Sequence, residues 1–305
     1  MGPKKANFRE LELASGRRVW RFGSAVKPYL FVLPAMLILL GIVIYPLIFS
    51  FSKSLTDFML AMPGEKFVGF QNYLTAFKTQ AFRQSLTFSI IFSVSATAIE
   101  LVLGFISALI LTRQFVGKRI ITVLLILPMM VTPVVVGIIW LLMFQPDFSV
   151  INGLLSRIGI KGPIWLQHRW TARLAVIIAD VWQWTPFFTL VLIGALLNLS
   201  SEVIESAKVD GATNVQILRL IKIPLMMPLI MVAILIRLID TFRVFDAIFI
   251  MTNGGPGNTT EVLSLHIYRT GLPFMNVSYA AAMSYLFLVL MTIITTILIR
   301  RLKRV

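Results

Sequence analysis

Six long apolar runs dominate the chain and are separated by shorter polar segments. The runs cover residues 29–51, 86–112, 120–144, 174–198, 225–251 and 279–299. Each is long enough to cross a bilayer, which takes about 20 helical residues. They lack the alternation of a barrel strand, and a backbone in lipid must satisfy its own hydrogen bonds, so we expect helices. The pattern predicts an all-α integral membrane protein, a six-helix transmembrane bundle.

Composition agrees with this pattern and limits the classes of partner that we expect. Hydrophobic residues make up 58% of the chain and charged residues only 13%, whereas soluble domains have about 25% charged residues. The net charge is +15, from 28 basic and 13 acidic residues. In a soluble chain such a charge suggests nucleic-acid binding. Here it is better explained by the Lys and Arg residues that collect in the cytoplasmic flanks of spanning helices. We expect membrane lipid as a partner and no nucleic acid.

The basic residues also predict the orientation. With the N-terminus inside, the cytoplasmic segments hold seventeen Lys and Arg residues and the opposite side holds nine. This bias favours both termini in the cytoplasm. The first apolar run is too long for a cleaved signal peptide. We therefore expect a basic cytoplasmic segment, residues 1–28, followed by one six-span domain, residues 29–305.

The sequence offers little catalytic chemistry. Cysteine is absent, and the two histidines, His168 and His266, have no carboxylate at a zinc-binding spacing. No glycine-rich loop with the spacing of a nucleotide-phosphate site occurs; Gly117-Lys118 is followed by arginine. We expect no catalytic residue, no metal and no cofactor in this chain. If ATP powers transport, another chain must bind it.

Six charged residues lie within the apolar runs, where charge is costly and usually functional. They are Glu100, Asp180, Arg237, Asp240, Arg243 and Asp246. The last four alternate in sign at a spacing of three, so neighbours can pair on a helix surface. Two interpretations stay open for this ladder: a self-neutralising buried row, or part of a wet translocation path. Glu100 and Asp180 lack a partner nearby in sequence, which favours structural hydrogen bonding over a proton relay.

Trp182, Gln183 and Trp184 form a second candidate for the translocation path. Aromatic faces and an amide suit a sugar ring, which is apolar on one side and carries hydroxyls at its rim. The alternative is that two tryptophans near Pro186 simply pack or lie at an interface. The sequence slightly favours packing.

A polar segment, residues 199–224, separates the fourth and fifth runs and is cytoplasmic by the charge count. Ser200 suits a helix N-cap, and Glu205 falls near the first turn, where the helix dipole favours anions. Gly211 permits a turn or a close backbone approach. Pro224 disfavours α geometry at the residue before it and marks the end of the segment. We expect a short helix here, either a docking surface or an ordinary amphipathic connector.

Residues 199–224 contain Glu205-Ser-Ala-Lys-Val-Asp-Gly-Ala212, and nine residues separate its glycine from Ile221-Lys-Ile-Pro224. This spacing resembles the EAA motif of binding-protein-dependent ABC importer permeases. The departures are Ser206, where the family usually has alanine, and Ile223, where it usually has leucine. The resemblance implies that this coupling segment contacts an ATPase. The residues expected to do so are Glu205, Ala207, Asp210, Gly211, Ala212, Ile221 and Pro224.

Four other stretches look like parts of carbohydrate-importer permeases of the maltose and glycerol-phosphate type. Their fifth span resembles Asp240-Thr-Phe-Arg-Val-Phe-Asp246 of this chain. The loop after that span resembles Thr252-Asn-Gly-Gly-Pro-Gly257 and Glu261-Val-Leu-Ser-Leu-His-Ile-Tyr-Arg-Thr270. Phe67-Val-Gly-Phe-Gln-Asn-Tyr73 resembles their first external segment. The matches run from about residue 28 to the C-terminus.

The resemblance implies a type I importer in the plasma (inner) membrane of a prokaryote. This chain would pair with a second homologous permease, two cytoplasmic ATPase subunits would hold ATP and Mg²⁺, and an extracytoplasmic solute-binding protein would deliver a solute. Closure of the ATPase pair would move the coupling segment, and the spans joined to it would switch access to the cavity. A neutral sugar or polyol is the first expectation for the solute and a phosphorylated polyol the second.

The alternative function is a self-sufficient, ion-coupled secondary transporter. Such a carrier would use the intramembrane carboxylates for protons and would transport solute without another chain.

Overall fold

The computed structural model describes residues 22–62, 64–146 and 149–302. The basic residues expected before the first span, up to residue 21, lie outside the described residues. Regular structure in the described part is helical, apart from one isolated bridge between Thr56 and Phe67. The chain divides into two compact units, Met1–Ser52 and Lys53–Val305.

The first unit contains one apolar helix. It consists of α2 (Phe22–Leu39), a π-helical turn η1 (Leu40–Ile44) and the start of α3 (Tyr45–Ser54). The wide turn directly precedes Pro46, whose ring would clash with a carbonyl in a regular α-helix. The predicted first span, 29–51, corresponds to Phe31–Ser54, and none of its apolar window is buried. A helix this exposed and apolar needs lipid or another chain around it.

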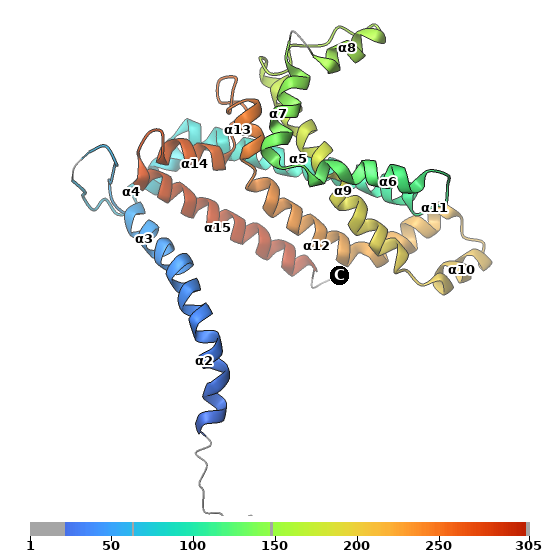
Figure 1. Ribbon diagram of the computed structural model, residues 1–305, viewed down its shortest axis with the longest axis horizontal. Helices are drawn as coiled ribbons and strands as arrows, with labels where there is room; N and C mark the ends of the chain where they lie inside the picture. The colour runs from blue at the N-terminus through green and yellow to red at the C-terminus, as the bar shows by residue number, and fades with distance from the viewer. Residues whose placement is uncertain (1–21, 63, 147–148, 303–305) are drawn as a thin grey trace, which may run out of the picture. The chain divides into compact units, whose positions relative to one another are not determined.

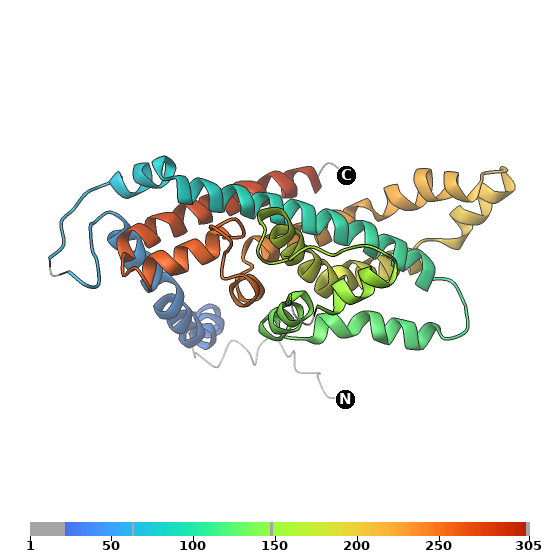
Figure 2. The same ribbon diagram turned by 90° about the horizontal axis from the view of Figure 1, so that it is seen from above.

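Four long helices build the second unit and run along its long axis (Figures 1 and 2). They are α5 (Gln80–Leu111), α9 (Arg169–Leu197), α12 (Ile223–Phe242) and α15 (Val277–Leu302). α12 is the main part of a longer span, Asn214–Phe242, that begins with α11 (Asn214–Gln216) and a second π-helical turn, η3 (Ile217–Lys222). α5, α9, α15 and the Asn214–Phe242 span are each longer than the roughly 20 residues that a bilayer needs.

Short helices cover the two ends of this bundle. α10 (Ser201–Val209) and α11 lie at one end, and α4 (Gln71–Lys78) and α14 (Leu263–Gly271) lie at the other (Figures 1 and 2). The two ends therefore differ: one carries the coupling segment, and the other carries the connections that include α4 and α14.

α5 and α9 pack most closely at Gly104. A Cβ added there would lie 2.5 Å from the Phe188 Cβ and 3.0 Å from the Thr189 backbone nitrogen. Real atoms do not approach this closely, so only glycine lets the two backbones come together here. Phe188 is fully buried at the contact.

The third predicted span, 120–144, is wrong as a single straight helix. The chain forms α6 (Lys118–Ile126), the 3₁₀ turn η2 (Leu127–Met130) and α7 (Pro133–Phe144), with a bend of 103°. Thr132 is extended, with φ −66° and ψ 145°, as expected for a residue before proline. Gln183 donates a 2.9 Å hydrogen bond to the Val131 carbonyl, which the break leaves without a helical partner.

The predicted fifth span, 225–251, also ends earlier than expected. α12 stops at Phe242, and α13 (Asp246–Met251) is a separate short helix after the turn at Arg243 to Phe245. A Cβ on Gly137 of α7 would lie 2.9 Å from the Ile250 Cβ, so α13 packs directly on α7. The fifth run therefore supplies one span and one packing helix.

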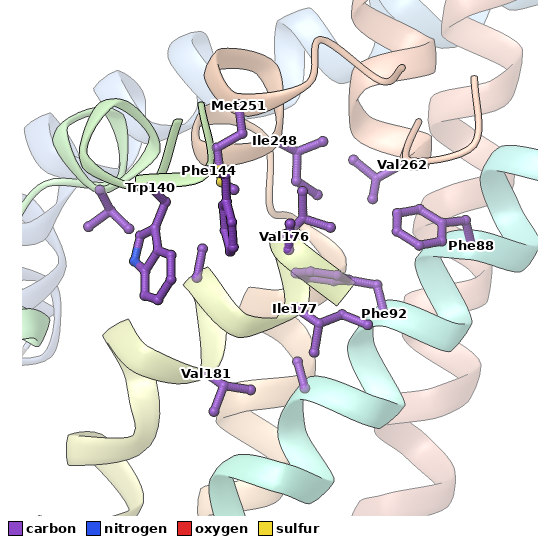
Figure 3. Close-up of a cluster of buried hydrophobic side chains, with 14 of the residues drawn as sticks. Phe88, Phe92, Trp140, Phe144, Val176, Ile177, Val181, Ile248, Met251 and Val262 are labelled. Atoms are coloured by element: carbon purple, nitrogen blue, oxygen red, sulfur yellow. The ribbon is translucent and has the colours of Figure 1, made fainter. Parts of the chain in front are cut away.

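The main hydrophobic core lies where α5, α7, α9 and α13 meet (Figure 3). Phe88 and Phe92 of α5 face Val176 and Ile177 of α9, and Ile248 of α13 lies nearby, all buried. The bend after α6 is what brings α7 into this cluster. α8 (Val150–Arg157) follows α7.

Polar contacts stabilise the segment between α3 and α4. Lys53 Nζ lies 2.5 Å from a Glu65 carboxylate oxygen, and this contact lowers the pKa of Glu65 below its ordinary value. Asn72 donates to the carbonyls of Ser54 and Thr56. The aromatic side chains Phe67, Phe70 and Phe77 are largely exposed, as interface anchors are.

Candidate functional site

α10 is closed by a complete Schellman turn at Gly211. The Gly211 amide donates to the Lys208 carbonyl at 3.0 Å, and the Ala212 amide donates to the Ala207 carbonyl at 2.9 Å. Gly211 has φ +80°, which L side chains adopt only with strain. The glycine of the coupling segment thus sets the helix end. Ser200 stands at the N-cap position, but its side chain makes no cap hydrogen bond within the described residues.

The outward face of α10 combines carboxylates with an exposed valine. Glu202, Glu205, Ser206, Val209 and Asp210 line a shallow hollow on it. Val209 is 89% exposed, whereas Ile204 and Ala207 of the same helix are half-buried. Sequence reasoning missed Val209, although its position four residues after Glu205 on the same helix face was readable.

The opposite face of α10 turns toward its own bundle. Ile204 and Ala207 are half-buried. Behind them is a cavity of about 530 Å³ between α10, the end of α5 and the start of the Asn214–Phe242 helix, lined by Ile204, Thr112, Arg113 and Lys222 among others. Ala207 therefore lies on the inner side of α10, whereas Glu205, Asp210 and Gly211 are exposed.

The expectation that Pro224 ends the coupling segment in non-helical geometry is wrong. Ile223 is helical, with φ −59° and ψ −49°, and the helix continues through Pro224. The π-helical turn η3 makes this possible because its wider turn removes the clash of the proline ring. Ile221 is half-buried and Pro224 exposed within one continuous helix.

Thr213 fixes the start of that helix. Its hydroxyl accepts from the Gln216 amide at 3.3 Å, and the Gln216 side chain accepts from the Thr213 amide at 2.8 Å. This capping box satisfies two amides at the helix N-terminus. Only Asp210 to Thr213 separate α10 from the span, so the two are joined by a short, ordered turn.

A buried ion network joins three spans in the bundle interior. Arg237 of α12 donates to both Glu100 oxygens of α5, at 2.7 Å and 2.9 Å, and to Asp180 of α9 at 2.5 Å. All three side chains are at most 7% exposed. The Arg237 guanidinium also lies 4.8 Å from the ring centroid of Trp184. Glu100 and Asp180 are thus structural partners facing the bundle, as their isolation in sequence suggested.

The interpretation of the fifth-run charges as a self-neutralising buried row is wrong. Arg237 pairs with other helices, and Asp240, Arg243 and Asp246 form no ion pair with described residues. Asp246 is on α13, so the helical spacing of three is broken after Arg243. These last three side chains are exposed, whereas Arg237 is closed off inside the chain.

The three residues of the tryptophan segment separate in space. Gln183 is 3% exposed, and its amide donates to the Val131 carbonyl at the break before α7. Trp184 packs on Arg237, and Trp182, 38% exposed, meets Trp140 edge-on at 5.8 Å between ring centroids. Trp182 lines an apolar groove rather than a polar surface. Gln183 and Arg237 are both buried, with 3% and 2% of their surface exposed.

An aromatic cluster next to the exposed charges was not found from sequence. Phe245 stacks on Phe249 at 5.3 Å between centroids, and Tyr268 of α14 meets Phe245 edge-on at 5.1 Å. Phe245 stands between Arg243 and Asp246 in the chain, and Tyr268 is 37% exposed. Aromatic faces beside carboxylates are typical of carbohydrate contacts. The contact between α13 and α14 creates the cluster, which no local pattern indicated.

The titratable groups of the described segments form no cluster of three that could hold a metal ion. His266 Nδ1 and Glu261 Oε1 share a hydrogen bond of 2.8 Å. The other carboxylate oxygen of Glu261 pairs with Arg269 at 3.2 Å. Arg269 in turn bonds to Asn253. These contacts hold the loop after α13 against α14 and suggest a structural role.

Comparison with known proteins assigns the family. The sequence model of the family described as "Binding-protein-dependent transport system inner membrane component" matches residues 100–304. The probable ABC transporter permease protein y4oQ of Sinorhizobium fredii is 37% identical over 276 residues, covering 90% of this chain and 89% of that protein. The trehalose/maltose transport system permease protein MalF of Thermococcus litoralis is 34% identical, covering 80% of this chain and 83% of that protein.

A solved structure has the same fold. It is a crystal structure of a bacterial ABC transporter involved in the import of the acidic polysaccharide alginate, one chain of which superposes with a TM-score of 0.80 at 23% identity. The match covers 93% of this chain and 99% of that chain. The predicted permease fold is therefore confirmed, and none of these relatives supports the ion-coupled alternative. The family match spans more than half of the sequence, and the chain belongs to the inner membrane components of binding-protein-dependent transport systems, the permease subunits of ABC importers.

Proposed function

We propose that the chain is the transmembrane subunit of an ATP-driven importer for a sugar or polyol. It forms half of the translocation path together with a second homologous permease. Two cytoplasmic ATPase subunits hold ATP and Mg²⁺ and dock on the coupling segment, residues 199–224. An extracytoplasmic solute-binding protein delivers the solute from the other side of the inner membrane.

The observation that carries this proposal is the exposed outer face of α10. Glu205, Val209 and Asp210 project from a helix whose end is set by the Schellman turn at Gly211. An isolated valine exposed at 89% gains free energy when a partner covers it. The flanking carboxylates supply specificity for basic groups on that partner. An ATPase cleft of complementary shape and charge fits this face.

Movement passes from α10 to the bundle through a short connection. The capping box at Thr213 fixes the start of the Asn214–Phe242 helix, and that helix carries Arg237 to Glu100 and Asp180. A displacement of α10 by the ATPases therefore moves three spans together. A rigid lever of this kind links one two-state assembly to another.

The solute class rests on relatives and on the aromatic cluster of Phe245, Phe249 and Tyr268, of which Tyr268 is exposed and the two phenylalanines are half-buried. One relative is a trehalose/maltose permease and another a probable permease for starch degradation products. In this chain Phe245, Phe249 and Tyr268 contact one another, and Phe245 lies in the sequence between the exposed residues Arg243 and Asp246. Stacking surfaces with nearby hydrogen-bonding groups suit a neutral carbohydrate passing through.

Replacement of Gly211 tests the docking role. Gly211→Asp in the assembled transporter should abolish ATP-dependent uptake, because it strains the turn at φ +80° and adds charge at the docking face. Gly159→Asp is the matched control: Gly159 has φ +77°, ends α8 with the same pair of hydrogen bonds, and also has open space around its Cβ. Full uptake by the Gly211→Asp transporter would disprove docking through this turn.

Val209→Asp examines the same face without backbone strain. We expect the variant to assemble in the membrane but to lose most ATPase association, measured by co-purification. Val116→Asp is the control, since Val116 is fully exposed in the loop between α5 and α6 and outside α10. Equal loss of ATPase in both variants would show a general charge effect and would contradict a specific role of Val209.

Uptake by reconstituted transporter with its binding protein identifies the solute. A panel should contain neutral disaccharides, polyols, phosphorylated polyols and amino acids. The proposal expects uptake of a neutral sugar or polyol. Uptake confined to amino acids would overturn the carbohydrate assignment and leave the docking role of α10 intact.

A further inference from the structure

The cavity between α10 and its bundle is lined by three basic side chains. Its volume of about 530 Å³ falls within the roughly 300–1,000 Å³ of small-molecule sites. The basic residues come from three parts of the chain: Arg113 just after α5, Lys208 of α10 and Lys222 of the Asn214–Phe242 span. Among the described residues that line the cavity, none is acidic. Three cations thus surround open space without a carboxylate.

These three cations are not neutralised by the described part of the chain. Arg113, Lys208 and Lys222 form no ion pair with any described residue. Like charges around one cavity repel each other unless an anion lies between them. Arg119 and Arg219, two other basic residues on this side of the spans, are exposed and are not among the lining residues. The general excess of cytoplasmic Lys and Arg therefore does not explain why three of them share this cavity.

α10 divides its charged side chains between two surfaces. Glu202, Glu205 and Asp210 line the outer hollow that we assign to the ATPase. Lys208, the only basic residue of α10, lines the cavity on the inner side. A protein bound on the outer hollow would therefore leave the cavity free for a different, anionic ligand.

The other walls of the cavity are largely apolar. They include Leu109 of α5, Ile204 of α10, and Ile217 and Leu218 of the Asn214–Phe242 span. The hydroxyl of Thr112, which also lines the cavity, donates to carbonyls of its own helix at 2.9 Å and 3.1 Å. The strongest donors available to a ligand are therefore those of the three basic side chains. A ligand with one anionic group and an apolar part fits this lining.

The cavity lies at the level where the spans leave the hydrocarbon. Arg113 directly follows the apolar run 86–112, and Lys222 precedes the run that begins at residue 225. The charge count puts these ends of the runs on the cytoplasmic side. Phosphate groups reach this level from two sources, the cytoplasm and the lipid head groups of the inner leaflet. Both sources offer the same chemistry, a phosphate joined to an organic part.

We propose that this cavity binds an organic phosphate on the cytoplasmic side, either a soluble phosphate ester or a phospholipid head group. The phosphate accepts hydrogen bonds from Arg113, Lys208 and Lys222, and the organic part lies against Leu109 and Ile204. The ligand adds a link between α10 and α5, beside the turn at residues 210–213 that joins α10 to the next span. This link stiffens the lever between α10 and the bundle. Only the stiffening rests on the proposed function; the binding does not.

Calorimetric titration of the purified full chain in detergent tests the site. The ATPases are left out, because their nucleotide sites would also bind phosphate. Phenyl phosphate, a phosphate joined to an apolar ring, should bind more tightly than inorganic phosphate. Arg113→Gln with Lys222→Gln should weaken its binding roughly tenfold or more. Arg119→Gln with Arg219→Gln is the matched control, since it removes the same charge from exposed positions on the same side and should leave binding unchanged. Equal weakening in the two double variants would overturn the proposal.

A cavity variant and a phospholipid complete the test. Leu109→Trp fills the cavity and keeps all three cations, so phenyl phosphate should bind more weakly, and unchanged binding would contradict the assignment to this cavity. Dihexanoyl phosphatidylglycerol, a short-chain phospholipid, is titrated in the same way. If it binds more tightly than phenyl phosphate, the ligand is a head group; if it binds more weakly, the ligand is a soluble ester. No ATPase or solute takes part, so these results are independent of the uptake by the Gly211→Asp transporter that tests docking.

Discussion

Arg237 is the residue on which the packing of the spans most depends. It offers its donors to Glu100 and Asp180 and its guanidinium face to Trp184, so four side chains from three helices share one buried point. Charges inside a bilayer are tolerated when they pair and face the bundle. Removing one member of such a group leaves the others charged and unpaired, which costs more than the pair itself contributes.

Arg237→Met should therefore destabilise the protein by about 3–5 kcal/mol, measured by unfolding of the purified chain in detergent. Arg243→Met is the matched control. Arg243 lies six residues further along the same segment, is exposed and forms no ion pair with described residues. We expect it to leave stability unchanged. Similar losses in the two variants would show that the network does not carry the stability assigned to it.

Sequence reasoning identified these charged residues but gave Arg237 the wrong partners. Glu100 and Arg237 are 137 positions apart, and Asp180 and Arg237 are 57 apart. A spacing of three made Asp240 look like the natural partner, because local pairs are the only ones that spacing can show. The coupling segment was easier: Glu205, Asp210 and Gly211 lie within one helix and its Schellman turn, so their spacing reflects their geometry directly.

At the scale of helices, the break between η2 and α7 decides how the core is built. Pro128 and Pro133 interrupt the helix, and the bend of 103° directs α7 across the bundle onto α13. The break leaves backbone carbonyls without helical partners, and Gln183 of α9 satisfies the one at Val131. A polar side chain buried at this point stabilises an irregular backbone inside an apolar bundle.

Gln183→Leu should cost about 1–3 kcal/mol of stability, since the Val131 carbonyl would remain buried without a donor. Thermal unfolding of the purified chain measures the loss. Gln145→Leu, an exposed position after α7, serves as control and should change little. If Gln183→Leu were as stable as the unmodified chain, another donor would have to reach Val131.

The close contact of α5 and α9 makes a second prediction at this scale. Gly104→Ala should destabilise the bundle by about 1–3 kcal/mol, because the new methyl group would meet Phe188 at 2.5 Å. Gly194→Ala, in α9 with no atom within 4 Å of its Cβ, should be neutral or slightly stabilising. Chemical unfolding of both variants measures the difference, and a harmless Gly104→Ala would mean that the helices separate readily at this point.

Hydrophobic runs predicted the helices well wherever the chain continues straight. Prolines account for two of the errors, whereas no proline lies at the turn where α12 ends, after Phe242. The helix that average hydropathy extends across residue 133 breaks after Met130, and Pro133 is the first residue of α7. Pro224 was expected to end a helix and is instead accommodated by a π-helical turn. A helix continues through a proline when a turn widens by one residue, and it ends when the backbone breaks instead. Packing partners such as Gln183 and α13 determine which of the two occurs.

Over the whole molecule, the two ends of the bundle carry different chemistry. α10, which presents carboxylates and Val209, lies at one end, and the starts of α5 and α9 and the loop after α13 lie toward the other (Figures 1 and 2). The continuous Asn214–Phe242 helix connects the coupling end to the ion network. Such polarity is what a subunit needs if force arrives on one side of the membrane and solute on the other.

The orientation that this polarity requires is open to direct measurement, because the natural chain contains no cysteine. Ser206→Cys on α10 and Ser156→Cys on α8 replace exposed hydroxyls on opposite sides of the proposed topology. A thiol reagent that cannot cross the membrane should label Ser156→Cys in intact cells and Ser206→Cys only in inverted vesicles. The charge bias of seventeen basic residues against nine is the physical reason. Labelling of Ser206→Cys from outside intact cells would reverse the orientation, remove α10 from the reach of any cytoplasmic ATPase and leave the docking proposal without support.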